Sequence, residues 1–225
     1  RRPTFEHPLG EPIDEAVAVG FHMLDRYGFH ALESLQCQVE RRSGGETGVK
    51  QVRCLSGDAV WRAMDEGMFD RKLLDAALNR LKRSPITRQP KRPLRDLAKS
   101  PDMFVIEYRD GLKAFVLTLN GAVNEWGVAW KTTAGARTST TFWTQEARPY
   151  MHFTYLVKGT EKMFHTGQPT WPAERTLMTS GLLDALLISK SKDGAAVRTD
   201  YLDFKYSTDW DWQQPPAPPR SRPGN

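Results

Sequence analysis

The feature that most constrains the fold is a run of short apolar segments in the middle of the chain, separated by tight-turn dipeptides. The segments cover residues 103–108, 112–119, 122–131 and 137–144, and the dipeptides include Asp110-Gly111 and Asn120-Gly121. Asp-Gly and Asn-Gly readily adopt the backbone conformation of two-residue hairpin turns. The run therefore predicts four consecutive antiparallel strands, a meander.

Helical periodicity appears on both sides of this run. Residues 29–42 place apolar side chains at intervals of three and four, and Ser43-Gly44-Gly45 ends that pattern. Further helices are predicted at 69–82, 149–165 and 172–189, and further strands at 15–21, 49–55 and 197–206. We expect one α+β domain over residues 1–206, with a mostly antiparallel sheet and helices on one face, followed by a Pro-rich tail at 207–225.

Composition and cysteine usage narrow the class of protein. Apolar residues make up 39% and charged residues 26% of the chain, which is ordinary for a globular protein. Cys37 and Cys54 have no C-x-x-C spacing, and the apolar runs are too short to cross a bilayer. Without a leader-like start we expect a cytoplasmic protein with no membrane partner. The opening Arg1-Arg2-Pro3 lacks a Met, which suggests a piece of a longer product.

The positive charge is concentrated between residues 82 and 99. Basic residues dominate this segment, Asp96 is its single acid, and no aromatic residue is interleaved. Such a run could attract phosphates, but no nucleic-acid motif accompanies it. We expect a solvated basic loop and no nucleic-acid partner.

The densest set of reactive side chains lies at residues 27–55. His30 and Glu33 are three residues apart on the predicted helix, so the carboxylate could orient the imidazole for acid–base work. The same spacing could supply two ligands to a divalent metal. The alternative is a helix-start histidine beside a surface glutamate, and the sequence leaves both readings open.

Charged residues around the following turn form a second candidate group. Glu40, Arg41, Arg42 and Glu46 could surround a polar substrate, because arginine clamps carboxylates and phosphates in a bidentate way. Arg109, in the predicted hairpin, could contribute to the same site. The alternatives are a solvated helix end and an ordinary cross-strand ion pair.

Common cofactor and hydrolase motifs are missing from the sequence. It has no G-x-G-x-x-G or P-loop pattern, and no G-x-S-x-G or H-E-x-x-H pattern. A nucleotide-binding fold is therefore not predicted for this chain, and we expect no NAD(P) binding by the chain alone.

Several local motifs together resemble one known family. They are Gly28-Phe29-His30 as G-x-H, V-E-R-R-x-G-G-E-T-G-V at 39–49, E-Y-R-D-G-L-K at 107–113, Asn120-Gly121, and P-x-E-R-T-L-x-T-S-G-L-L-D-A at 172–185. Over nearly its whole length to about residue 206, the chain resembles the C-terminal, non-Rossmann domain of the Gfo/Idh/MocA oxidoreductases. It is most similar to an uncharacterised bacterial group of this kind, frequent in planctomycetes.

The resemblance implies a substrate-side domain that acts on a small polar or sugar-like molecule. In that family the histidine of G-x-H works with an aspartate four residues earlier and with a lysine of an E-K-P motif; His30 matches the histidine. Arg26 stands at the aspartate position, with Asp25 one place away, and the lysine and nucleotide domain are not in this sequence. The family also pairs subunits through an open sheet face, so we expect a homodimer of that type.

These considerations give three hypotheses. In the first, His30 is the general acid or base, Glu33 orients it, Glu46 assists, and Glu40, Arg41, Arg42 and Arg109 contact substrate. In the second, the domain alone is an ester or phosphoester hydrolase or a lyase, using His30, Glu33 and Glu46 as bases or metal ligands. In the third, it is a non-catalytic module that dimerises through its sheet.

Overall fold

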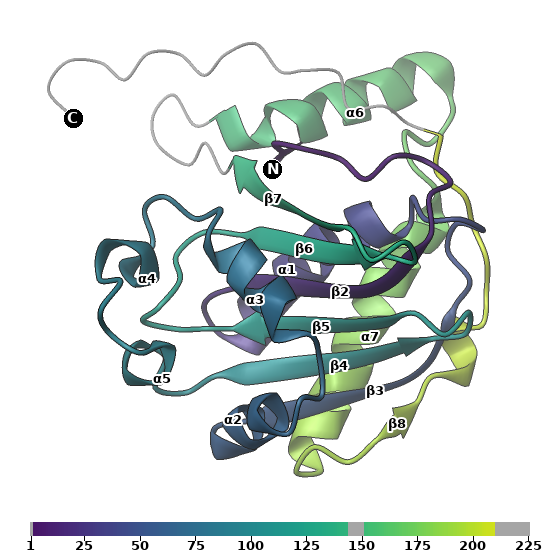
Figure 1. Cartoon of the computed structure of the whole chain (residues 1–225). Helices are drawn as coiled ribbons and strands as arrows, with labels where there is room; N and C mark the ends of the chain where they lie inside the picture. Colours follow the sequence, from purple (N-terminus) through teal and green to yellow (C-terminus); the bar gives the residue numbers. More distant parts are fainter. Residues whose placement is uncertain (1, 144–150, 210–225) are drawn as a thin grey trace, which may run out of the picture.

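A mixed, eight-stranded sheet organises the molecule (Figure 1). The computed structural model describes residues 2–143 and 151–209. Within these residues the strand order is β1-β7-β6-β2-β5-β4-β3-β8, and every neighbouring pair is antiparallel except β2 and β5. The strands are β1 (Arg2–Pro3), β2 (Ile13–Gly20), β3 (Val49–Ser56), β4 (Asp102–Tyr108), β5 (Lys113–Thr118), β6 (Gly127–Thr132), β7 (Arg137–Trp143) and β8 (Val197–Arg198).

The predicted α+β class and mostly antiparallel sheet are confirmed, but the four-stranded meander is wrong. β2 inserts between β5 and β6, with Val17 facing Phe115 on one side and Ala129 on the other. Residues 16–20 are buried completely, as expected for a central strand covered on both faces. The Asn120-Gly121 turn therefore leads away from β5 and does not close a hairpin onto β6.

Helices cover both faces of the sheet, which corrects the prediction that they gather on one face. Figure 1 shows α3 in front of the sheet and α1 and α7 behind it. The side chains of the central strands alternate between two apolar clusters, one under α1 and α7 and the other under α2 and α3. The helices are α1 (Leu24–Val39), α2 (Asp58–Asp65), α3 (Arg71–Leu78), α4 (Pro85–Arg88), α5 (Leu94–Leu97), α6 (Thr154–Thr166) and α7 (Ala173–Ser191), with 3-10 turns η1 (Met151–Phe153) and η2 (Asp200–Leu202).

Both faces of the sheet are covered by helices, and the homodimer stays a prediction. Trp126 and Trp130 are fully buried in the cluster beneath α1 and α7. Subunit pairing through an open face would need a bare sheet surface, and α2 and α3 occupy the second face.

No helix among the described residues is long and apolar enough to cross a membrane.

Several element boundaries differ from the sequence prediction. α1 begins five residues earlier than expected, because Gly28 lies inside the helix and allows close packing against Leu24 and Leu183. The predicted last strand, 197–206, shortens to β8 and η2, followed by a single bridge between Tyr206 and Glu46. The first residues of the helix predicted at 149–165, and residues 210–225 of the predicted tail, lie outside the described residues.

β2, α1 and β3 form a crossover that aligns strand ends. β3 is antiparallel to β4, β4 is antiparallel to β5, and β5 is parallel to β2. β2, β3 and β5 therefore point the same way, and their carboxyl ends, at Gly20, Ser56 and Thr118, meet at one edge of the sheet. The same edge receives the start of α1.

Candidate functional site

The second half of α1 is enclosed, and this decides the environment of most predicted site residues. Every residue from Ser34 to Arg42 is buried, since the sheet covers one side of the helix and α7, residues 7–11 and Tyr206 cover others. Glu40, Arg41, Arg42 and Glu46 are therefore interior side chains. The alternative of a solvated helix end does not apply to them.

Arg175 of α7 joins two of the predicted residues. Its Nε donates to both carboxylate oxygens of Glu40, at 3.1 and 3.0 Å, and its Nη1 donates to Glu33. Thr179 Oγ1 donates to Glu33 Oε1 at 2.8 Å. Burial raises the pKa of Glu40, although the Arg175 charge and the Tyr206 hydroxyl act in the opposite direction. Glu33 is thus bound to α7 through Arg175 and Thr179.

Glu46 is saturated with hydrogen bonds. Its Oε1 accepts the backbone N–H groups of Thr47 and Gly48 at 2.9 and 2.8 Å, and its Oε2 accepts Gln36 Nε2 at 2.5 Å. Arg42 Nη1 lies 3.7 Å from Glu46 Oε2, and the Glu46 side chain is 0% exposed. A carboxylate held in this way has neither solvent access nor a free direction from which to take a substrate proton.

Arg42 is equally committed to the protein. Its Nε donates to Asp110 Oδ2 at 2.7 Å, its Nη1 to the Val39 carbonyl oxygen at 2.8 Å, and its Nη2 to Thr47 Oγ1 at 3.0 Å. The guanidinium also lies 4.7 Å from the centroid of the Tyr108 ring. Burial alone would lower the pKa of Arg42, but the charges of Glu46 and Asp110 outweigh it and raise the pKa.

Gln36 and Tyr206 connect these contacts into one buried network. Gln36 Nε2 donates to the Tyr206 hydroxyl at 2.9 Å, and that hydroxyl donates to Glu40 Oε2 at 2.8 Å. Tyr108 donates to Gln36 Oε1 at 3.1 Å. The network binds α1, α7, the β4–β5 hairpin and the C-terminal segment to one another, so its first role is structural.

The other three predicted residues lie elsewhere. Arg41 donates through Nε to the His7 carbonyl oxygen and so holds the N-terminal segment. Arg109 pairs at the surface with Asp203, at 3.0 Å. His30 is exposed on α1, edge-on to Tyr27 and Trp126 at ring-centroid distances of 5.7 and 6.1 Å. The structure brings Glu33, Glu40, Arg42 and Glu46 into one network and separates the rest.

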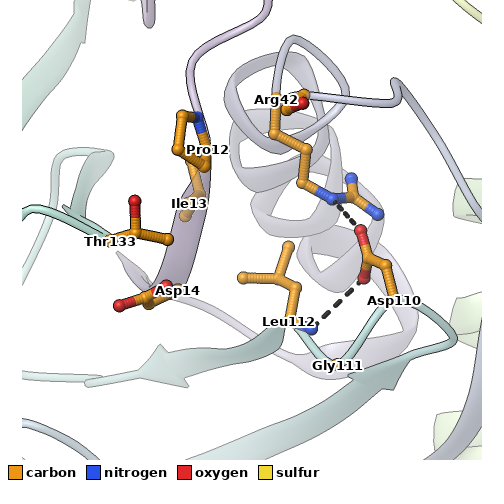
Figure 2. A pocket seen from close by; sticks show the side chains of 9 residues that line it. Pro12, Ile13, Asp14, Arg42, Asp110, Gly111, Leu112 and Thr133 are labelled. Carbon is orange, nitrogen blue, oxygen red and sulfur yellow. Dashed lines mark hydrogen bonds and ion pairs between the residues drawn. The ribbon is translucent and has the colours of Figure 1, made fainter.

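A cavity of about 400 Å³ lies beside Arg42, between the start of β2 and the β4–β5 hairpin. Figure 2 shows the Arg42 guanidinium turned toward Asp110, with Asp14 and Thr133 across the cavity. Ile13 and Leu112 supply apolar lining. Because the guanidinium already has several protein acceptors, this cavity offers a ligand few of the contacts expected of an arginine clamp.

A larger cavity, which we call the strand-end pocket, was not predicted from the sequence. Its volume is about 630 Å³, and it lies where β2, β3 and β5 end and α1 begins. Lys190 Nζ donates to both oxygens of Asp102, at 2.7 and 2.6 Å, and Ser56 Oγ donates to Asp102 as well. The lining residues are Met23, Leu24, Asp25, Ser56, Gly57, Ser100, Pro101, Asp102, Asn120, Leu187 and Lys190.

A strained residue marks the same edge. His22 has a φ of 71°, a left-handed conformation that is uncommon outside glycine. Its backbone N–H donates to Asn120 Oδ1, and Asn120 Nδ2 donates back to its carbonyl oxygen at 3.4 Å. Such strain tends to cluster at functional sites. Asn120 thus both lines the pocket and holds the loop that leads into α1.

The sequence carried one signal that could have located this pocket. A strand, a helix and a parallel strand in succession place their site outside the carboxyl ends of the strands. The polar groups themselves come from positions more than 80 residues apart, such as Asp102 and Lys190, so no local motif joins them.

In the described part of the chain, no group of three or more His, Cys, Asp and Glu side chains is arranged to hold a metal ion. Compared with known protein families, with curated proteins and with solved structures, the chain has no match.

Proposed function

We propose that this chain is the substrate-side part of an oxidoreductase-like protein and binds a small polar or sugar-like molecule in the strand-end pocket. One observation carries the proposal: three parallel strand ends and the start of a helix surround a cavity with apolar walls and a few converging polar groups. Open α/β sheets bind small molecules outside the carboxyl ends of their strands. Ligand sites typically combine apolar lining with a small number of placed polar groups.

The polar groups suit a ligand rich in hydroxyls. The Lys190 ammonium, 42% exposed, can donate to a hydroxyl oxygen, while the Asp102 and Asp25 carboxylates can accept from hydroxyl hydrogens. An ion pair that is only partly buried keeps hydrogen-bonding capacity for such a partner. The resemblance to the Gfo/Idh/MocA C-terminal domain supports the same class of ligand. We further propose that the chain binds no NAD(P) by itself and acts in the cytoplasm.

A site in the strand-end pocket changes which side chains are candidates for proton transfer. Asp25, Asp102 and Lys190 face the pocket, whereas Glu33 and Glu46 are held in the buried network. His30 stays a prediction, since it is exposed but lies outside the lining of both cavities. The hydrolase or lyase hypothesis has less support, because it needs His30, Glu33 and Glu46 to face one substrate.

A titration with hydroxyl-rich probes tests the proposal. The 225-residue chain is titrated calorimetrically with myo-inositol, D-glucose and D-gluconate, and separately with NAD⁺. We expect binding of at least one polyol, weakened about tenfold or more in Lys190→Met because a charged hydrogen bond is lost. Lys162→Met, which removes an exposed lysine of α6, is the matched control and should leave the affinity unchanged.

Three results would contradict the proposal. The first is that none of the polyols binds, and the second is that the two lysine variants lose affinity equally. The third is tight NAD⁺ binding by the chain alone, which would refute the assignment to the substrate side.

A further inference from the structure

The sequence predicts a solvated basic loop at 82–99; its charged side chains are exposed, and the segment is also anchored to the core. It forms the one-turn helices α4 and α5, and α5 buries Leu94 and Leu97 in the core. Ser84 Oγ donates to Glu125 at 2.9 Å. A Cβ on Gly121 would lie 2.5 Å from the Leu97 carbonyl oxygen, so the two backbones are in close contact. The segment is thus pinned to the connection between β5 and β6.

This segment carries more than the whole net charge of the protein. It contains seven basic residues and one acid, a formal charge of +6, whereas the complete chain has +5. The remaining residues therefore sum to −1. All seven basic residues are exposed: Lys82, Arg83, Arg88, Lys91, Arg92, Arg95 and Lys99. We call this surface the basic platform.

Most of this charge is not neutralised within the fold. Among the residues that the structure describes, Lys82, Arg88, Lys91 and Lys99 make no side-chain hydrogen bond or ion pair. Arg95 is the best anchored member of the platform, paired with an aspartate of α2 and lying over the Trp61 ring. An exposed concentration of positive charge without internal partners attracts an external partner of opposite charge.

We propose that the basic platform binds an acidic segment of a partner protein. A small anion is a poorer fit, because none of the seven basic residues lines either of the two cavities described above. Nucleic acid is a poorer fit because the segment has no aromatic residue for base stacking. Its helices, of four residues each, are also too short to enter a major groove. An extended acidic polypeptide needs only complementary charge along its length.

A charge-matched pair of triple variants tests the proposal on the full chain. Arg88→Gln/Lys91→Gln/Lys99→Gln neutralises three platform cations, and Lys158→Gln/Lys162→Gln/Lys192→Gln neutralises three exposed lysines elsewhere. Binding of a fluorescent oligo-glutamate peptide is followed by anisotropy at low ionic strength. We expect the platform variant to bind the peptide about tenfold more weakly, because each of the three exposed cations should contribute about twofold to the affinity and the factors multiply. The control variant should stay within about twofold of the native protein.

Specific outcomes would overturn the inference. Equal loss in both variants would mean that net charge alone drives binding. Failure of the peptide to bind at low salt, or tighter platform-dependent binding of a DNA oligonucleotide of equal charge, would also refute it. Circular dichroism of both variants checks folding, which the exposed positions should preserve. The proposal uses no residue of the strand-end pocket, so its outcome is independent of the proposed function.

Discussion

Replacing Arg175 with methionine should expose how strongly the buried network depends on one cation. Arg175 holds Glu33 and Glu40, and Glu40 is only 1% exposed. Removing one member of a buried ion pair leaves an uncompensated charge and typically destabilises a protein by about 3–5 kcal/mol. Methionine keeps much of the volume, so the loss should come mainly from electrostatics.

Protonation of Glu40 sets an upper bound on the stability that Arg175→Met loses through this carboxylate. At pH 7, binding a proton to a carboxyl group whose ordinary pKa is 4.5 requires about 3.4 kcal/mol, at about 1.36 kcal/mol per pH unit. The protonated acid can stay hydrogen-bonded to Tyr206. We therefore expect Arg175→Met to lower the free energy of unfolding by about 3 kcal/mol at pH 7. The midpoint temperature should fall by roughly 6–12 °C for a chain of this size.

The pH dependence is the discriminating readout. In the variant, the pKa of folded Glu40 lies further above its unfolded value, so the folded state holds the proton more tightly. The stability associated with that proton is present below the unfolded pKa and is lost as the pH rises through the folded pKa. At pH 5 the protonation cost is only about 0.7 kcal/mol. The defect of Arg175→Met should therefore be much smaller at pH 5 than at pH 7.

Urea unfolding monitored by circular dichroism at pH 5 and pH 7 measures the stability loss and its dependence on pH. Arg71→Met is the matched control: its pair with Asp75 is about half exposed, so the loss should stay below about 1 kcal/mol. Adding Glu40→Gln to Arg175→Met should recover stability and flatten the pH dependence. A loss below about 1 kcal/mol at pH 7, or a loss equal at both pH values, would refute the reasoning.

Three further outcomes follow from local geometry. Burial lowers the pKa of His7, so its contribution to the free energy of unfolding is present above the ordinary pKa of 6.5 and is lost as the pH falls through the folded pKa. Unfolding titrations of His7→Gln should therefore show a smaller loss of stability in acid than those of the native protein. Gly121→Ala should destabilise the protein more than Gly135→Ala in urea unfolding. Both glycines have a positive φ, which costs an alanine about 1 kcal/mol, but only at Gly121 would the added Cβ also meet a backbone oxygen. Burial raises the pKa of the Cys37 and Cys54 thiols to about 12, so a thiol-specific reagent should label them only after unfolding, and rapid native labelling would contradict their enclosure.

Local pattern was sufficient for most elements of this fold. The strands at residues 49–56, 102–108 and 113–118 and the helix at 173–191 lie close to their predicted positions, because periodicity and turn residues act over a few neighbours. The start of α1 was missed, since Gly28 looks like a helix boundary locally but serves close packing against α7. Strand order was missed as well: β2 pairs with segments about 100 residues away.

The candidate site shows the same division. The sequence by itself determined that acids and bases crowd the turn after α1, and it marked the basic run at 82–99. Only the tertiary structure decided that Arg175 and Tyr206, more than 130 residues from Glu40, enclose those acids in a buried network. It also decided that Lys190 meets Asp102 at the strand ends, where a pocket forms. The physical reason is that the charge state and accessibility of a side chain depend on which distant groups desolvate and pair with it, and local sequence does not contain that information.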